Sequence, residues 1–421
     1  MEQSLKYTNR RQSLGSQFSR TLFVIPSGEL RMRSHSVAYR FKVASDFLYL
    51  CGVEVAEAYL VVAGEKSYFL SDHIGAASAL WEDVNSLMSE DQEKLFNIEF
   101  AAVSKLQDIL QDHLRDFDRL AFPVGRSEWL DRTLLEQVSF QNRRRSRFTS
   151  IPLALCDSRT LVGRLRQKKE ADEIDFMRMA AQKSSAVYQE LFQKNLLGAS
   201  ERDVANFLES EFMKQGMHWT AYETIVGSGE RGTTLHARAT ERNLRSGETV
   251  LIDAAGEWQG YCADITRVLP VGKSFSKEQK TIYEIVLKAQ KEVLKKIRPG
   301  GTLASLHETA QQFLLEGLKE AGITGEISEL MPHSTSHWIG MDVHDPSAYV
   351  DESGNAIKLS EGMSFTVEPG LYFRDKSSAY YGIGVRIEDD VVVTDQGCEI
   401  LSSASKEVEE IENLRSKLEL N

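Results

Sequence analysis

The stretch TVLIDAAGEWQGYCADITRV, residues 249–268, constrains the fold most because it sets two carboxylates within apolar segments. Apolar runs flank the turn-forming residues 256–260, so the pattern predicts a β-hairpin. With the turn centred on Trp258 and Gln259, Asp253 would lie directly across from Asp264 on one face. Neighbouring carboxylates repel one another and are costly to remove from water. A shared proton, a basic partner or a metal ion must therefore offset their charge.

Two further acids repeat this pattern nearer the C-terminus. Glu368 ends the apolar run at residues 363–368, and Glu388 lies within the run at residues 384–394. Arg386 precedes Glu388 by two residues, so both side chains would point to the same face of a strand. For this pair alone, a simple salt bridge is the preferred interpretation.

Imidazole groups accompany these acids in the stretch T-S-H-W-I-G-M-D-V-H-D, residues 335–345. His337 and His344 belong to it, and His333 precedes both. A single histidine is usually a satisfied structural side chain, so only the combination favours a metal site. Four carboxylates and one imidazole form a mainly oxygen ligand set, which suits two divalent ions. It does not suit a structural zinc site.

The length of 421 residues favours two domains. Short apolar strands mix with helices over residues 21–160, which indicates an α/β domain. The expected strands are at residues 21–26, 47–50, 58–63 and 67–70, and a helix is expected at residues 93–116. The charged segment RQKKEADE, residues 166–173, is the expected domain boundary.

Beyond this boundary the pattern favours an α+β domain, because helices alternate with hairpin-like strand pairs. Ser276 and Gln279 form a capping-box start for a helix that ends before Pro299. The other helices are expected at residues 168–195, 200–216 and 303–321, and the strands at 222–226, 248–254, 261–269, 363–368 and 384–394.

The glycine-rich stretch G-S-G-E-R-G, residues 227–232, matches a dinucleotide-binding fingerprint. That fingerprint requires a following helix that covers a sheet, and residues 233–246 carry too few apolar positions for one. A turn that allows close backbone approach is therefore the preferred interpretation.

Five motifs together resemble the pita-bread metallopeptidases, most closely the aminopeptidase P family. They read I-V-G-S-G-E…L-H, L-I-D-A-A-G…Y-C-A-D-I-T-R, P-H-S-T-S-H-W-I-G-M-D-V-H-D, T-V-E-P-G-L-Y and G-V-R-I-E-D-D. The resemblance implies an α+β pita-bread (creatinase/aminopeptidase) catalytic domain over residues 166–421. A smaller α/β creatinase-like N-terminal domain would precede it over residues 1–165.

The resemblance also implies roles for nine side chains. The metal ligands would be Asp253, Asp264, His337, Glu368 and Glu388, holding two divalent ions, usually manganese with cobalt or zinc as substitutes. The catalytic groups would be His236, His344, Glu368 and Arg386, and the substrate contacts would be His236, His333 and His344. Trp338 and Tyr372 are the candidates for packing against a substrate ring.

The implied function is that of a Xaa-Pro aminopeptidase, which releases the N-terminal residue from peptides with proline in second position. Prolidase, which cuts Xaa-Pro dipeptides, shares the ligand set and stays an alternative, because the sequence does not show how the pocket treats the substrate's C-terminus. An interaction module that kept the fold and lost activity is the alternative from another class. The resemblance further implies a homo-oligomer, most simply a dimer.

The composition narrows the partners and the compartment. A net charge of −12 disfavours nucleic acid as a partner, and the basic run at residues 143–147 is best explained as a solvated patch. No apolar run approaches the roughly 18 residues of a membrane span, so no membrane association is expected. The four cysteines are far apart, which fits free thiols and predicts a cytoplasmic protein. The first 20 residues lack an apolar signal core and are expected to be frayed.

Overall fold

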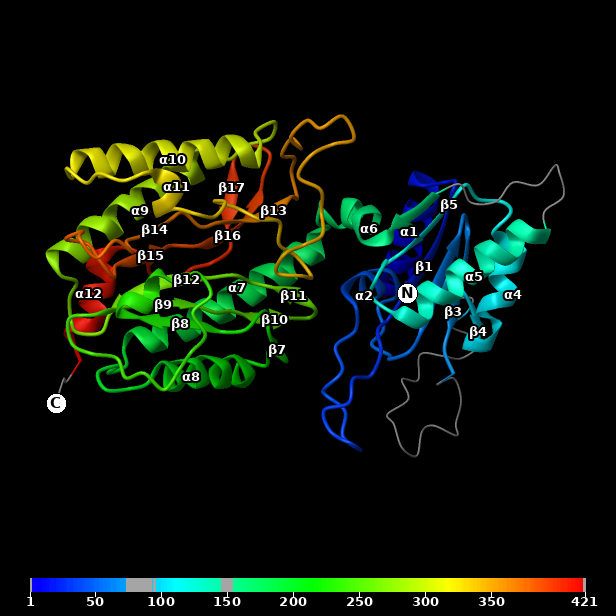
Figure 1. Cartoon of the computed structure of the whole chain (residues 1–421), viewed down its shortest axis with the longest axis horizontal. Coiled ribbons are helices and arrows are strands. Elements are labelled where there is room, and N and C mark those ends of the chain that lie inside the picture. The colour runs from blue at the N-terminus through cyan, green and yellow to red at the C-terminus, as the bar shows by residue number, and fades with distance from the viewer. Residues whose placement is uncertain (1, 73–92, 94–95, 145–153, 419–421) are drawn as a thin grey trace. The chain divides into compact units, whose positions relative to one another are not determined.

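Two compact units make up the chain, Met1–Leu165 and Arg166–Asn421. The computed structural model, shown in Figure 1, describes residues 2–72, 93, 96–144 and 154–418. The last three residues of the basic run at 143–147 lie outside these ranges.

The first unit is an α/β domain built on one mixed sheet with the strand order β4-β3-β2-β1-β5-β6. Strand β1 (Thr21–Pro26) runs antiparallel to β2 (Tyr59–Ala63) and parallel to β5 (Arg119–Phe122). The remaining elements are β3 (Lys66–Leu70), β4 (Glu99–Ala101), β6 (Ala154–Asp157), η1 (Val103–Lys105), α1 (Glu2–Gln17), α2 (Ser45–Cys51), α4 (Leu106–His113), α5 (Glu128–Arg144) and α6 (Ser158–Arg166). Leu22, Val61 and Leu120 of the sheet pack with Leu110 and Leu134 of α4 and α5 in its core. The expected α/β class is therefore confirmed.

Some local predictions in this unit are wrong. Residues 47–50 belong to helix α2 and not to a strand, and the single helix expected over residues 93–116 is interrupted by β4, so that α4 begins at Leu106. A four-residue apolar run is too short for its period to separate strand from helix. Gly52, at φ 69°, ends α2 by donating its N–H to the carbonyl of Leu48, a helix-stop signal that the sequence did offer.

The N-terminal segment forms helix α1, contrary to the frayed end expected from the sequence. Arg10 donates to the carbonyl of Tyr49 at 3.1 Å, and Arg11 donates to the carbonyl of Leu50 at 2.7 Å. These carbonyls lie in the last turn of α2, where cations are favourable. Because the contacts are polar, the apolar pattern of the sequence does not reveal them.

The second unit has the α+β architecture expected, since its described strand pairs are all antiparallel. One group has the order β12-β9-β8, and a second has the order β13-β16-β17. Their bounds are β8 (Ile225–Ser228), β9 (Thr249–Asp253), β12 (Thr266–Pro270), β13 (Ser364–Val367), β16 (Asp389–Val393) and β17 (Cys398–Ile400). The shorter groups are made by β7 (Trp219–Thr220), β10 (Gly256–Trp258) and β11 (Tyr261–Cys262), and by β14 (Gly370–Tyr372) with β15 (Gly384–Arg386).

Helices flank these strands on both sides, as Figure 1 shows. Helix α7 (Ala171–Phe192) packs on β10 and β11, and α8 (Glu201–Lys214) packs on β8. On the other side α9 (Lys277–Lys296) contacts β13, β14 and β15, and α10 (Leu303–Glu320) packs on α9. The capping box at Ser276 and Gln279 is confirmed, with both reciprocal hydrogen bonds present. The short helices α11 (Ile327–Leu330) and α12 (Val408–Ser416) complete the unit. None of the helices in the described ranges has the length and apolarity needed to cross a bilayer.

The register predicted for the 249–268 hairpin is wrong by two residues. Trp258 pairs with Tyr261, and Asp253 pairs with Thr266, so Asp264 is not the direct partner of Asp253. The turn centres on Gln259 and Gly260, whose φ angles are 52° and 82°. Two positive φ values are typical of the type I′ turn that suits a tight hairpin, and glycine accepts this conformation readily. A shift of two keeps Asp264 on the face expected, because side chains alternate with period two.

The glycine-rich stretch is a turn, as the sequence favoured. Residues 229–233 form the short 3-10 helix η2 (Gly229–Thr233), and residues 234–246 form no helix. A Cβ placed on Gly384 of β15 would lie only 2.0 Å from the carbonyl oxygen of Gly232. Glycine is thus required where this turn and β15 approach each other.

We expect Gly260→Ala to lower the stability of the second unit by about 1–2 kcal/mol, because alanine is strained at φ 82°. Gln259→Asn should leave the stability unchanged or slightly higher, because asparagine tolerates positive φ better than glutamine. Calorimetric unfolding of both variants measures the difference. Equal unfolding temperatures for Gly260→Ala and the parent chain would contradict the turn.

Candidate active site

All nine side chains singled out in the sequence line one cavity of about 660 Å³ in the second unit. They are His236, Asp253, Asp264, His333, His337, His344, Glu368, Arg386 and Glu388. The structure therefore brings together every residue to which the resemblance gave a metal-ligand, catalytic or substrate-contact role.

The four acids lie at breaks between short strands, which is why they converge. Asp253 is the last residue of β9, and Asp264 lies between β11 and β12. Glu368 separates β13 from β14, and Glu388 separates β15 from β16. Side chains alternate between the two faces of a sheet only along a continuous strand. At a strand break this alternation no longer applies, so acids from two groups of strands can point into the same cavity.

The ligand atoms of Asp264, His337 and Glu388 all lie within 4.8 Å of one another. His337 Nε2 is 3.4 Å from Asp264 Oδ2 and 3.5 Å from Glu368 Oε1. Asp264 Oδ1 is buried and has no hydrogen-bond partner among the described residues. A buried carboxylate oxygen without a partner is costly, so this arrangement fits a divalent cation that all three residues could reach.

Crowding and burial raise the pKa values of the acids. Burial, reinforced by the neighbouring Asp264, raises the pKa of Asp253 to about 6 against the opposing charge of Arg386. Burial likewise raises the pKa of Glu368 to about 7, although His337 and Arg386 oppose it. The pKa of Glu388 lies well above its usual range for the same reason, with Asp264 as its strongest repelling neighbour. Without a cation this cluster therefore holds protons near neutral pH.

The imidazoles divide into two groups. Burial would lower the pKa of His337, but Asp264 and Glu368 outweigh it and raise that pKa to about 9. Burial lowers the pKa of His333 to about 4, and its Nε2 lies 2.9 Å from the hydroxyl of Tyr372. Burial also lowers the pKa of His344, whose ring stands edge-on to His337 with the ring centroids 4.4 Å apart. His333 and His344 are therefore neutral groups at physiological pH.

Arg386 forms an ion pair with Asp253. Among the residues that the structure describes, Arg386 forms no salt bridge with Glu388, which the sequence had suggested. Its Nε also donates to Thr266 Oγ1 at 3.0 Å, and the hydroxyl of Thr266 donates to Glu388 at 2.6 Å. The hydroxyl of Tyr222 donates to the other oxygen of Asp253. Tyr222 and Thr266 were missed in the sequence, because neither belongs to a charged pattern.

The two aspartates of the stretch 335–345 are structural ion-pair partners. Arg166 contacts Asp342 at 2.7 Å and also Asp345, and Lys169 contacts Asp345 at 3.1 Å. Burial would raise the pKa of Asp345, but the two cations outweigh it and lower the pKa below its ordinary value. These contacts anchor the loop that carries His337 and His344.

Trp338 does not face the cavity, contrary to its suggested role in packing against substrate. It is buried among Leu306, Phe365 and Val391 in an apolar cluster. Tyr372 is also buried, and its hydroxyl is taken by His333 and Arg386. The apolar groups that do line the cavity are Ile225, Leu235, Val343 and Tyr349.

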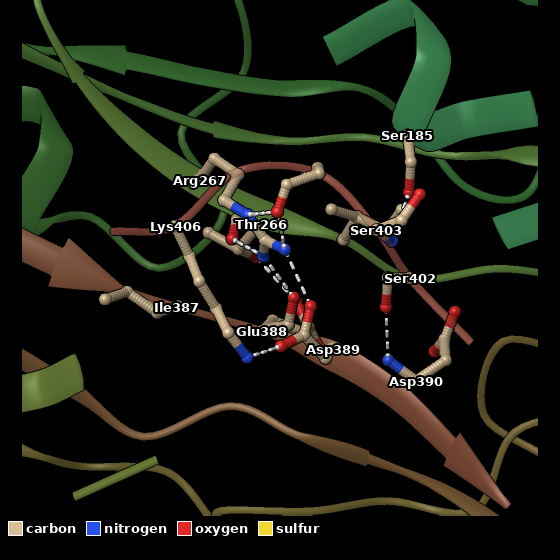
Figure 2. A network of polar contacts seen from close by, with 12 residues as sticks. Ser185, Thr266, Arg267, Ile387, Glu388, Asp389, Asp390, Ser402, Ser403 and Lys406 are labelled. Atoms are coloured by element: carbon tan, nitrogen blue, oxygen red, sulfur yellow. Dashed lines mark hydrogen bonds and ion pairs between the residues drawn. The ribbon is translucent and has the colours of Figure 1, made fainter. Parts of the chain in front are cut away.

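A buried polar network, shown in Figure 2, supports the backbone behind Glu388. Arg267 donates to the carbonyl of Glu388 at 2.5 Å and to Asp389 Oδ1 at 2.6 Å. Lys406 forms an ion pair with the other oxygen of Asp389. Arg267 and Lys406 hold the pKa of Asp389 near 2 in spite of its burial. Nearby, Asp390 accepts the backbone N–H of Asp264 at 2.9 Å, which links the segment between β11 and β12 to β16.

A cavity lined by carboxylates and imidazoles, on this fold, is typical of a class of metal-dependent hydrolases. The Metallopeptidase family M24 model matches residues 175–395, and the model of the aminopeptidase P N-terminal domain matches residues 7–121. The chain belongs to metallopeptidase family M24 and carries the aminopeptidase P N-terminal domain.

Relatives and solved structures are similar to this chain over almost its whole length. A Xaa-Pro aminopeptidase of Escherichia coli is 32% identical, with 97% of each chain covered. A mitochondrial intermediate cleaving peptidase 55 of Arabidopsis thaliana is 30% identical, with 97% of this chain and 82% of that one covered. The structure of E. coli aminopeptidase P with the inhibitor Pro-Leu matches with a TM-score of 0.88 at 30% identity, covering 98% of each chain. As a member of this family, the chain is a hydrolase that uses divalent metal ions.

We expect divalent-ion binding to strengthen as the pH rises from 5 to 8, because ions and protons compete for the same groups. The folded pKa values of about 6 for Asp253 and about 7 for Glu368 exceed their ordinary values. These acids therefore stabilise the metal-free fold at low pH, and that contribution is lost as the pH rises through 6 and 7. The raised pKa of His337 acts in the same direction up to about pH 9.

The measurement is the unfolding temperature with and without Mn²⁺ at pH 5, 6, 7 and 8. The increase in unfolding temperature that Mn²⁺ causes should become larger as the pH rises. A series at matched ionic strength with a monovalent salt controls for screening. An increase that became smaller toward pH 8 would contradict the competition.

Proposed function

We propose that this chain is an aminopeptidase that releases the N-terminal residue from peptides whose second residue is proline. The observation that carries the proposal is the convergence of five potential ligands on one cavity, with the ligand atoms of Asp264, His337 and Glu388 mutually within 4.8 Å. Full-length relatives that bear the name Xaa-Pro aminopeptidase support the substrate class.

The proposed ligands of two divalent ions are Asp253, Asp264, His337, Glu368 and Glu388. Four carboxylates and one imidazole favour a hard cation, and we propose Mn²⁺, with Co²⁺ or Zn²⁺ as substitutes. When bound, such ions supply Lewis acidity and make a water molecule acidic enough to react near neutral pH.

Glu368 is the proposed proton carrier. Burial raises its pKa to about 7 before any ion binds, and bound cations would lower that pKa, so Glu368 would be ionised and able to accept a proton. It would take a proton from the attacking water and deliver it to the proline nitrogen of the leaving peptide. That nitrogen must be protonated for the amide bond to break.

His344 is the proposed hydrogen-bond donor to the oxygen of the scissile carbonyl as negative charge develops on it. A neutral imidazole can donate one N–H, and burial keeps His344 neutral. His236 and His333 would contact the peptide on the same wall of the cavity. Arg386 would act through Asp253, whose carboxylate it fixes together with Tyr222, and this acid would receive the substrate's amino terminus.

Recognition of proline must depend on shape, because a proline amide has no N–H to donate. Ile225, Leu235, Val343 and Tyr349 provide apolar surface in the cavity, and we propose that the ring packs against part of it. This assignment replaces Trp338 and Tyr372.

The decisive experiment is a substrate panel with added Mn²⁺, comparing a Xaa-Pro dipeptide, a Xaa-Pro-Yaa tripeptide and a Met-Ala peptide. We expect cleavage of the tripeptide. Cleavage of the dipeptide alone would identify a prolidase. A purified protein that recruits no divalent ion and cuts none of the three would instead be an interaction module with this fold.

Two histidine variants separate metal binding from catalysis. His337→Ala should abolish activity and weaken metal binding, because it removes a proposed ligand. His344→Ala should keep its metal content while kcat falls roughly 100-fold or more, the usual cost of one oxyanion donor. His218→Ala, exposed and away from the cavity, is the matched control. Metal analysis and steady-state kinetics are the measurements, and full activity in either site variant would refute its role.

A homo-oligomer and a cytoplasmic location stay proposals. All four cysteines are free thiols, which agrees with a reducing compartment. Light scattering of the purified chain and cell fractionation test the two proposals.

A further inference from the structure

Two arginines are found among the described residues that line the cavity, Arg238 and Arg386. The guanidinium of Arg386 is committed, since it donates to Asp253, Thr266 and Tyr372. Arg238 is different, because its side chain is 79% exposed. Within the part of the chain that the structure describes, it forms an ion pair with Glu223, which is 3.2 Å away and 66% exposed. A pair so open to solvent is weak and exchanges its partner readily.

The position of Arg238 relates it to the reacting groups. It follows His236 by two residues, which limits the distance between their Cα atoms to about 7 Å. Both residues line the cavity, whereas Ala237 between them is buried and does not. Arg238 is fixed at the rim by a β-bridge to Ile225, another cavity residue. His236 is close enough to His333 and His344 to influence their pKa values, so Arg238 is two residues along the chain from this group of three histidines.

The chemistry of the rim complements one end of a short peptide. The interior of the cavity is rich in carboxylates, which favours the substrate's cationic amino terminus there. The part of a tripeptide beyond the scissile bond spans two residues, about 7 Å, and ends in a carboxylate. A guanidinium at the rim binds that carboxylate with charge-assisted, two-pronged hydrogen bonds.

We propose that Arg238 binds the C-terminal carboxylate of short substrates, so that the chain prefers Xaa-Pro-Yaa tripeptides with a free C-terminus. This inference rests on the proposed function. Glu223 competes with the substrate carboxylate for the same guanidinium and thereby weakens the preference. Arg238 and Glu223 together thus determine the preference for peptide length and for a charged C-terminus.

The test compares Xaa-Pro-Leu as the free acid and as the C-terminal amide, with the full chain loaded with Mn²⁺. The free acid should have a kcat/KM about 10-fold higher, a modest effect for a charged contact because Arg238 is exposed to solvent, and the difference should lie mainly in KM. Arg238→Met should lower the kcat/KM for the free acid to the value for the amide. It should change the kcat/KM for the amide by no more than about 2-fold. Glu223→Gln should increase the preference for the acid.

Arg245→Met is the matched control, because Arg245 is exposed, carries the same charge and does not line the cavity. It should leave the ratio of acid to amide unchanged. Equal kcat/KM values for acid and amide in the parent chain would overturn the proposal. An equal loss for both peptides in Arg238→Met would overturn it too.

Binding of Pro-Leu and of Pro-Leu amide, measured by calorimetry, separates this proposal from the proposed function. Tighter binding of the acid that Arg238→Met removes would support the subsite even in a chain that cleaves neither tripeptide. Cleavage of both tripeptides with no preference in cleavage or binding would retain the aminopeptidase and refute the subsite. Absence of binding for both dipeptides would also count against the subsite.

Discussion

Mutual repulsion among four carboxylates, of which three are buried and Glu368 is 15% exposed, is the constraint on which the catalytic unit depends. Each acid is withdrawn from water into a cavity where its neighbours are also negative, and the pKa of Asp253, Glu368 and Glu388 is raised as a result. Such a cluster destabilises the fold unless protons or cations balance it. The rest of the unit can be understood as the framework that holds these charges together until a divalent ion does so.

That framework combines covalent continuity with buried ion pairs. The acids lie at strand breaks, so the backbone on each side is fixed in antiparallel pairs while the side chains turn inward. Arg386 and Thr266 restrain the carboxylates by direct hydrogen bonds. Arg267, Asp389 and Lys406 restrain the backbone of Glu388 from behind. Removing a single member of such a buried set leaves its partner uncompensated, which is more costly than the absence of the whole set.

The sequence predicted the cavity better than the strands that form it. All nine marked side chains line one cavity. The four acids were visible as charges in apolar stretches, whereas the roles of all nine residues followed from the motifs that resemble the family. The hairpin register was wrong because it depends on the φ angles of Gln259 and Gly260, which composition does not encode. Tyr222 and Thr266 were missed because a hydroxyl at a strand end has no pattern of its own. The strand predicted at residues 47–50 was wrong for another reason, because a short apolar run is compatible with both helix and strand.

The anchoring of Asp345 by Arg166 and Lys169 has a consequence for where the catalytic body begins. The match to the family model starts at residue 175, yet the imidazole-bearing loop is already held by cations that precede it. The backbone of Lys169 also donates to the carbonyl of Gly362, ahead of β13. The short charged segment at the start of the second unit is therefore part of the structure that holds the imidazole-bearing loop in place. A shortened chain that began at the family boundary would leave a buried aspartate with no counter-ion.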